Sequence, residues 1–306
     1  MKVLVTGAAG HMATLGLPGL EARHELRLAD VRPPARMPAG ASFQQLSLME
    51  ASDADLVALF RDMDVVIHSA YIHSGGGDVY TPAPPQIERF DAELDNIRMT
   101  QRVYRCALQA GVRRVVVMSS NHAADWYEHN EVHRRARDMV YPTDMPLADN
   151  FYGWAKASCE LLAHPYACGV FGRSMEMVML RIGSPYPIDV RKYEPGAPPI
   201  VSSLTRPQGR AAFKRALGAF LSPRDCAALC RCAVESPLAL PAGAVPWVVA
   251  YGISDNTRAF WSLESARRIL GYAPQDDSEV IYAADVQRLL MDGSPQASGR
   301  LGAGAG

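Results

Sequence analysis

The chain begins MKVLVTGAAGHMA (residues 1–13), and this stretch decides the fold. The apolar residues 3–5 predict a short buried strand that runs straight into a turn. Gly7 and Gly10 suit that turn, because glycine adopts backbone angles closed to other residues and lets a phosphate approach main-chain N–H groups. Ala13, a small residue in the third position, permits close packing of a following helix. The stretch therefore predicts a turn that binds a dinucleotide.

Strand and helix patterns alternate through the first part of the chain. Strands are expected at 3–6, 25–29, 64–68, 114–118 and 174–181, and helices at 11–22, 52–61, 88–110 and 151–167. Repeated strand–helix–strand units predict a parallel sheet with helices on both faces. The fold class is therefore α/β, a doubly wound (Rossmann) sheet that binds ligands at the carboxyl ends of its strands.

The second half of the chain has a different character. Residues 183–209 are rich in proline and glycine, and a late strand is expected at 245–251. The predicted division is an NAD-binding domain over 1–182 and a smaller, loop-rich substrate-binding region over 183–292, interleaved with the last sheet elements. Residues 293–306 (GSPQASGRLGAGAG) are low in complexity and are expected to be disordered.

Asp30 closes the second expected strand, about twenty residues after the glycine turn. A carboxylate there can accept hydrogen bonds from both hydroxyls of an adenosine ribose, and its charge repels a 2′-phosphate. The position thus favours NAD over NADP. Arg32 and Arg36 keep the alternative open, because either side chain could contact a phosphate.

A second motif, YGWAK at 152–156, places Tyr152 and Lys156 four residues apart on one face of a helix. A free tyrosine titrates near pH ~10 and is a weak base at neutral pH, but a neighbouring ammonium group favours its ionised form. Ser120 follows directly after the strand expected at 114–118, and from this position its hydroxyl can bind a substrate oxygen. The three side chains predict the oxidation of an alcohol beside a bound nicotinamide.

Composition excludes several other classes. The net charge of −1 favours neither nucleic acid nor anionic lipid, and no run approaches the ~20 apolar residues of a membrane span. Of six cysteines, Cys226, Cys230 and Cys232 lie close together, but in an Ala/Leu-rich helical stretch without a paired ligand motif. No metal is therefore expected, and reduced thiols favour a cytoplasmic protein.

These residues resemble the extended short-chain dehydrogenase/reductase family, in its NAD-dependent epimerase/dehydratase branch, over about residues 1–285. Within it the chain is most similar to uronate dehydrogenases. The matching segments are TGAAG (6–10), SSNH (119–122), YGWAK (152–156), RIGS (181–184), YGISDNTRAFW (251–261) and GYAPQDDSE (271–279). The segments at 71–90, 122–150 and 188–210 are longer than this resemblance leads one to expect.

The resemblance implies a role for each of several residues. Tyr152 would be the base, Lys156 its partner and Ser120 the ligand of the substrate hydroxyl. The implied cofactor contacts are Gly7, Ala9, Gly10, His11, Met12, Asp30, Val31, Ala70, Asn96, Ser119, Tyr152, Lys156 and Ile182. The implied substrate contacts are Ser120, Asn121, His122, Ser184 and Arg191, to which His73, on a loop expected at the cleft mouth, is added as a candidate.

The implied reaction oxidises the anomeric hydroxyl of a hexuronic acid to an aldarolactone and reduces NAD. A homodimer is implied as well, built through the helix that carries the Tyr/Lys pair and its neighbour. Two alternatives stay open: a sugar-nucleotide epimerase or dehydratase that keeps its cofactor bound, and a non-enzymatic NAD-binding protein. His68, at the end of a buried strand, is expected to pack rather than react.

Overall fold

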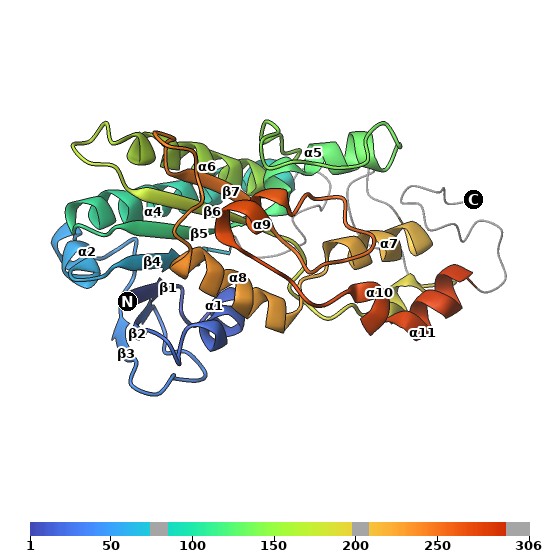
Figure 1. Cartoon of the computed structure of the whole chain (residues 1–306), viewed down its shortest axis with the longest axis horizontal. Coiled ribbons are helices and arrows are strands. Elements are labelled where there is room, and N and C mark those ends of the chain that lie inside the picture. The colour runs from blue at the N-terminus through green and yellow to red at the C-terminus, as the bar shows by residue number, and fades with distance from the viewer. Residues whose placement is uncertain (74–84, 198–207, 292–306) are drawn as a thin grey trace.

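The computed structural model describes residues 1–73, 85–197 and 208–291 and contains one seven-stranded parallel sheet (Figure 1). The strand order is β3-β2-β1-β4-β5-β6-β7. The strands are β1 (Lys2–Thr6), β2 (Glu25–Asp30), β3 (Ser42–Gln45), β4 (Val65–His68), β5 (Arg114–Ser120), β6 (Glu176–Ile182) and β7 (Trp247–Gly252). The chain moves outward from β1 to β3 and then returns to the other side at β4. The carboxyl ends of β1 and β4 therefore flank the switch point at which such sheets bind ligands.

Two sets of helices cover the two faces of the sheet. The helices are α1 (His11–Gly16), α2 (Asp53–Phe60), α3 (Pro85–Glu88), α4 (Phe90–Gln109), α5 (Asp125–Tyr127), α6 (Phe151–Cys168), α7 (Gly209–Ala219), α8 (Pro223–Glu235), α9 (Glu264–Leu270), α10 (Ser278–Ile281) and α11 (Ala283–Val286). Val3 and Val5 point to the face that α1, α8 and α9 cover, whereas Leu4 points to the face of α2, α4 and α6. Because both faces of the sheet are buried, the central strands β1 and β4 are mostly apolar.

Helix ends follow local sequence signals. Ser52 and Ser222 each accept a hydrogen bond from the backbone N–H three residues on, at 3.1 Å, and so cap α2 and α8. The expected helix over 11–22 is shorter in the structure: α1 ends at Gly16 and a 3-10 turn follows over Leu17–Gly19. Pro18 accounts for the change, because it has no N–H to continue the α-helical pattern.

Strand β3 was not expected. It is one of the two edge strands of the sheet, three of its four residues are exposed, and its sequence SFQQ has no buried apolar alternation. Its pairing with β2, in which Leu28 lies beside Phe43, comes from the tertiary fold.

The C-terminal part is loop-rich and carries its own small core. Phe213, Leu217, Val286, Leu289 and Leu290 pack together between α7 and the final helical turns, far from the N-terminus in Figure 1. The expected division into a domain over 1–182 and a substrate-binding region over 183–292 remains a prediction. The tail expected at 293–306 lies outside the described residues. None of the helices in the described part of the chain has the length and apolar character needed to cross a bilayer.

Candidate active site

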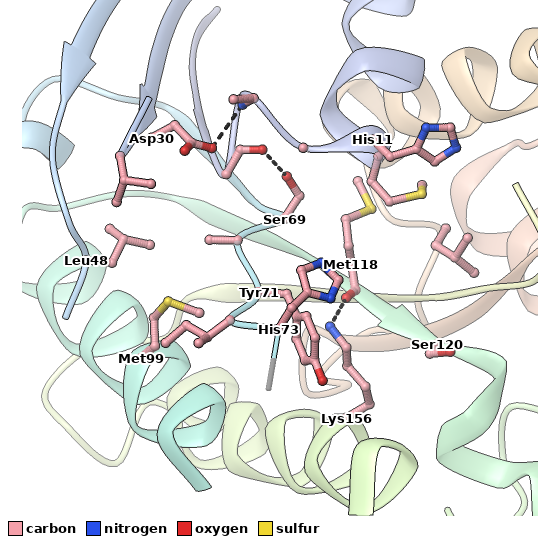
Figure 2. Close-up of a pocket in the computed structure, with 18 of the residues that line it drawn as sticks. His11, Asp30, Leu48, Ser69, Tyr71, His73, Met99, Met118, Ser120 and Lys156 are labelled. Carbon is pink, nitrogen blue, oxygen red and sulfur yellow. Dashed lines mark hydrogen bonds between the residues drawn. The ribbon is translucent and has the colours of Figure 1, made fainter. Parts of the chain in front are cut away.

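A cavity of about 860 Å³ opens at the carboxyl ends of the strands (Figure 2). Its size is that of sites that bind small molecules and cofactors. It is lined by the glycine turn after β1, the ends of β2, β5 and β6, the loop after β4 and the first turn of α6, including Gly7, Asp30, Tyr71, Ser120, Tyr152, Lys156 and Ile182. Elements that are remote in sequence thus meet around one space.

The glycine turn packs tightly against the loop that follows β4. Gly7 has a φ of +70°, and a Cβ on it would lie 2.4 Å from the backbone nitrogen of Ala70. Gly10 donates its N–H to the carbonyl oxygen of Gly7 at 3.0 Å, which closes the turn. Only glycine fits at position 7, and the backbone of the turn therefore stays directly accessible to the cavity.

Asp30 holds a fixed orientation at the rim of this cavity. Its Oδ2 accepts the N–H of Ala9 at 2.9 Å, and its Oδ1 accepts the N–H of Arg32 at 3.3 Å. A carboxylate has acceptor capacity left for ribose hydroxyls after two such bonds. Arg36 instead pairs with Glu21 at 2.7 Å, whereas Arg32 lines the cavity. The residues present therefore fit the adenosine end of NAD.

All but one of the predicted cofactor contacts line this cavity. The exception is Asn96, a buried residue of α4. Its side chain accepts the N–H of Ile72 at 2.8 Å and donates to the carbonyl oxygen of Ile72 at 3.0 Å. Asn96 thus fixes the loop after β4 from behind, and a direct contact with the cofactor remains a prediction.

The predicted catalytic residues lie together. Tyr152 and Lys156 project from the start of α6, and Lys156 Nζ lies 5.7 Å from the centre of the Tyr152 ring. Lys156 Nζ also donates to the carbonyl oxygen of Met118 at 2.9 Å, which holds the ammonium group against β5. Ser120, the last residue of β5, lines the same space, and its Oγ accepts the N–H of His122 at 3.2 Å.

Tyr71 and Glu93 also belong to the site, although no sequence pattern indicated them. The Tyr71 ring centre lies 5.1 Å from Lys156 Nζ and 5.4 Å from the Tyr152 ring, and its hydroxyl donates to the buried Glu93. Burial, reinforced by Glu93, raises the pKa of Tyr71 well above its usual value, so this tyrosine stays protonated. Tyr71 and Glu93 are 22 positions apart in the sequence, and no local sequence pattern predicts their contact.

His68 is buried at the end of β4, as expected for a packing residue. Its ring nitrogens lie 2.9 Å from the Thr6 hydroxyl and 3.2 Å from the Thr100 hydroxyl. Burial, together with the charge of Lys156, lowers the pKa of His68 to about 3. The imidazole is therefore neutral at physiological pH.

The predicted substrate contacts divide into two groups. Ser120, His73 and His122 line the cavity, whereas Asn121, Ser184 and Arg191 are not among the described residues that do so. The N–H of Ser184 donates to the carbonyl oxygen of Ala219 at 2.7 Å. Asn121 is buried, and its amide can bridge Ile182 and Arg215.

Arg191 lies on the surface of the molecule. Its side chain is 86% exposed and pairs with Asp189 at 2.9 Å. None of these three, Asn121, Ser184 and Arg191, is among the described residues that line the cavity, and their contacts with a substrate remain predictions.

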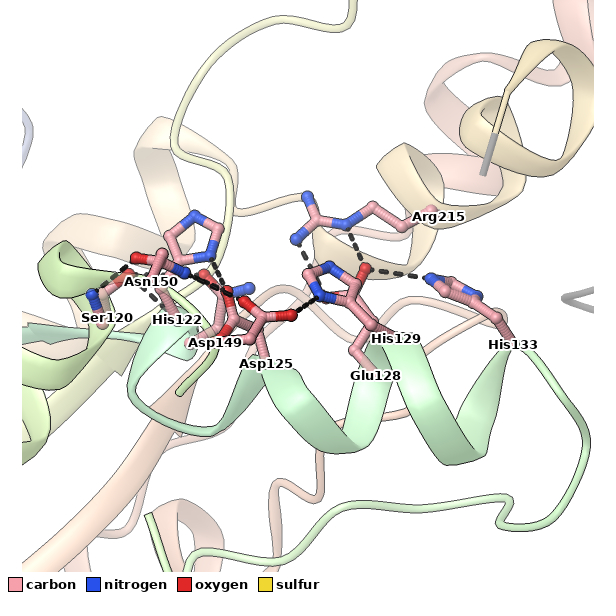
Figure 3. A network of polar contacts seen from close by, with 11 residues as sticks. Ser120, His122, Asp125, Glu128, His129, His133, Asp149, Asn150 and Arg215 are labelled. Carbon is pink, nitrogen blue, oxygen red and sulfur yellow. Dashed lines mark hydrogen bonds and ion pairs between the residues drawn. The ribbon is translucent and has the colours of Figure 1, made fainter. Parts of the chain in front are cut away.

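A polar network, buried or half-buried except for the exposed Asp149, extends from the cavity-lining residues Ser120 and His122 (Figure 3). Ligand-type atoms of Asp125, His129 and Asp149 lie within 4.8 Å of one another, a spacing that would also suit a metal ion. However, His129 Nδ1 lies 2.6 Å from Asp149 Oδ2, which is a hydrogen-bond distance, so a proton joins these two groups.

Cys226 and Cys230 are buried free thiols within α8.

Comparison with known proteins agrees with this geometry. The chain is 31% identical over 299 residues to the uronate dehydrogenase of Pseudomonas syringae pv. tomato, covering 96% of this chain and 89% of that protein. It is 30% identical over 285 residues to the NAD-dependent glucose-6-phosphate dehydrogenase of Haloferax volcanii, covering 90% and 94%. A solved structure of a mutated uronate dehydrogenase superposes with a TM-score of 0.66 at 26% identity, over 99% of this chain and 94% of that one.

A family-level match covers most of the sheet and the whole catalytic segment. Residues 3–188 match the NAD dependent epimerase/dehydratase family. This range, more than half of the chain, includes the glycine turn, Asp30, Ser120 and the YGWAK helix. The predicted family, its NAD dependence and the Rossmann fold are thereby confirmed. The chain belongs to the NAD-dependent epimerase/dehydratase family.

Proposed function

We propose that this chain is an NAD-dependent dehydrogenase that oxidises a ring hydroxyl of a sugar acid or a related anionic sugar, with the anomeric hydroxyl going to a lactone. One observation carries the proposal. A single cavity holds the nucleotide features, Gly7 and Asp30, at one end and the side chains of Ser120, Tyr152 and Lys156 at the other.

The chain's own residues handle the proton of the substrate hydroxyl. Tyr152 acts as its phenolate, which accepts that proton and becomes neutral tyrosine, and Ser120 hydrogen-bonds the same substrate oxygen. The Ser120 Oγ is oriented by the N–H of His122. Lys156, held by the Met118 carbonyl, places positive charge where negative charge develops on oxygen. Bound NAD supplies the acceptor for the hydride, so the alcohol carbon loses H⁻ and the oxygen loses H⁺.

The charges around the cavity support an anionic substrate. Among the described lining residues the carboxylates are Asp30 and Glu50, both at the nucleotide end. The catalytic end is lined by Arg89, His73 and His122 besides Lys156. A site lined by positive and neutral groups favours sugars that carry a carboxylate or a phosphate. Uronate and glucose 6-phosphate, which name two relatives of the chain, are both anionic.

The proposal is tested by incubating the purified chain with NAD and free uronic acids, sugar phosphates, neutral aldoses or nucleotide sugars. We expect stoichiometric growth of reduced-nicotinamide absorbance with an anionic sugar, and a lactone by mass spectrometry. The variant Tyr152→Phe is the matched control, because it removes only the phenolic oxygen. Isomerisation of a nucleotide sugar without net NADH would instead identify an epimerase, and oxidation of neutral aldoses alone would contradict the anionic substrate class.

We further propose a homodimer formed through α4 and α6. The two helices pack side by side, and Phe90 and Leu161 on them are 40% and 53% exposed. Burying such side chains against a second copy is favourable. Leu161→Glu should halve the mass measured by light scattering, and an unchanged mass would contradict this interface.

We propose the cytoplasm as the compartment of the protein. All six cysteines are free thiols, which is typical of proteins in a reducing compartment.

A further inference from the structure

A buried carboxylate joins the two segments that carry the catalytic side chains. Asp125, which begins α5, is fully buried. Its Oδ2 lies 2.8 Å from Nδ1 of His122 and accepts a hydrogen bond from Nδ2 of Asn150 at 3.0 Å (Figure 3). His122 follows the segment of Ser120, and Asn150 precedes the helix of Tyr152. One oxygen atom of Asp125 is therefore hydrogen-bonded to a residue of each of these two segments.

Asn150 transmits this contact to the catalytic helix. It is the N-cap of α6, and its Oδ1 accepts the N–H of Gly153 at 2.8 Å. The first turn of α6 also lies directly on the His122 backbone, since a Cβ on Gly153 would come within 2.1 Å of the His122 carbonyl oxygen. Asp125 thus secures both the orientation of the His122 ring and the docking of the helix beside it.

The His122 ring is the part of this arrangement that meets the cavity. It lines the cavity, and its centre lies 5.6 Å from the centre of the Tyr152 ring. A neutral imidazole that donates from Nδ1 to a carboxylate has its acceptor lone pair on Nε2. Because Nδ1 is directed at Asp125, Nε2 is the nitrogen on the opposite side of the ring.

We propose that Asp125 is a positioning residue of the active site, which holds His122 with its proton on Nδ1 so that Nε2 accepts a hydrogen bond from a substrate hydroxyl. The assignment to substrate rests on the proposed function. Asp125 itself touches neither substrate nor cofactor and acts through His122 and Asn150.

Burial and the neighbouring groups act in opposite directions on the pKa of Asp125, and the net result is a pKa above the usual value. Burial raises the pKa of Asp125, but its hydrogen bond to His122 and the charges of His122 and His129 oppose that rise, while Asp149 adds to it. His129 itself is buried, which disfavours its charge, yet its hydrogen bond to Asp149 and the charges of Glu128, Asp149 and Asp125 raise its pKa. The imidazole rings of both His122 and His129 thus lie close to the Asp125 carboxylate.

The more distant charges of the network are balanced among themselves. Glu128 pairs with Arg215 at 2.8 Å and with His133 at 3.1 Å. This second set leaves the rings of His122 and His129 as the imidazole partners of the Asp125 carboxylate.

The direct test is the nitrogen NMR spectrum of the histidine side chains in the full chain without substrate. We expect neutral His122 to carry its proton on Nδ1 in the wild type, and this preference to be lost in Asp125→Ala. Asp125→Asn keeps the shape and removes the charge, so it covers the case in which the alanine variant does not fold. A His122 tautomer that is the same in the wild type and both variants would overturn the proposal.

Kinetics provide the second readout. Asp125→Ala should lower kcat/KM about 100-fold, the cost of a misplaced group in an active site, while the Kd for NAD stays within about twofold. Asp138→Asn is the matched control, since it removes one carboxylate from an exposed position of the same 122–150 segment. Unchanged kcat/KM in both Asp125 variants, or an equal loss in Asp138→Asn, would contradict the positioning role. If the wild type oxidises no anionic sugar, the proposed function fails, and the tautomer measurement still decides the role of Asp125.

Discussion

Gly153 lies so close to His122 that a Cβ atom on it would be 2.1 Å from the His122 carbonyl oxygen. The glycine inside YGWAK is therefore a packing requirement and not a spacer between Tyr152 and its neighbours. It allows the first turn of α6 to rest on the backbone that leaves β5, which brings Tyr152 and Ser120 to the same cavity.

Gly153→Ala should displace the start of α6 and separate these two side chains. We expect kcat/KM to fall about 100-fold, because a shift near 1 Å is enough for such a loss, and the free energy of unfolding to fall by about 1–3 kcal/mol from overpacking. Steady-state kinetics and urea unfolding measure both. Ala163→Gly, farther along α6, costs about 1 kcal/mol in helix propensity and about 0.8 kcal/mol for its buried methyl group, and should keep its activity. Full activity in Gly153→Ala would refute the packing argument.

Tyr152→Phe should abolish most turnover without loss of cofactor binding. Removal of a general base costs about 10²- to 10⁴-fold, whereas the aromatic ring and its contacts with Tyr71 and His122 are kept. Turnover is followed by NADH formation and NAD affinity by calorimetry. Tyr71→Phe is the comparison, since it deletes a hydroxyl that binds Glu93 and should reduce turnover less. Equal turnover in wild type and Tyr152→Phe would remove this residue from the mechanism.

Asp30→Ala should weaken the preference for NAD over NADP. The variant loses both the acceptor for ribose hydroxyls and the charge that repels a 2′-phosphate, and hydrogen bonds to a charged group contribute about 1.5–3 kcal/mol, which corresponds to a change of roughly 10- to 150-fold in the ratio. The ratio of kcat/KM values for the two cofactors gives the answer. Arg36→Ala is the control, because Arg36 is paired with Glu21. An unaltered ratio in Asp30→Ala would contradict the ribose assignment.

The two decisive motifs could be predicted because each is local. A strand that enters a glycine turn and a Tyr/Lys pair at helical spacing are complete within 13 and 5 residues, respectively. The parallel fold then follows, since alternating strands and helices allow few arrangements. The edge strand β3 escaped prediction because its side chains are mostly exposed.

The contacts that support the site are not local, and for that reason they could not be predicted. Asp125 meets Asn150 across 25 residues and Tyr71 meets Glu93 across 22, in pairs that no periodicity marks. Arg191 illustrates the same limit: the resemblance implies that it contacts the substrate, its side chain is exposed and pairs with Asp189, and the contact stays a prediction. Sequence spacing defines a position in space only inside a regular element.

Glu160→Gln should destabilise the fold strongly. Glu160 on α6 and Arg181 on β6 are both buried, and Arg181 Nη2 lies 2.7 Å from Glu160 Oε2. Removing one partner of a buried pair leaves the other charge uncompensated, at a cost of about 3–5 kcal/mol. Urea unfolding measures this cost. Asp95→Asn, which breaks the exposed pair with Arg98, should cost less than about 1 kcal/mol, and equal losses in the two variants would contradict the argument.

His68 should make the fold sensitive to acid. In the folded chain its pKa is lowered to about 3, whereas an unfolded histidine titrates near ~6.5. Between these values the unfolded state binds a proton that the folded state does not, so the free energy of unfolding falls as the pH drops through this window. Linkage gives a loss of about 2 kcal/mol between pH ~7 and pH ~5 from this residue alone. His68→Gln retains a side chain that can hydrogen-bond Thr6 and Thr100 but cannot titrate. Urea unfolding at both pH values should therefore show a flatter pH dependence in the variant than in the wild type, and parallel curves would mean that His68 is protonated at little cost in the folded chain.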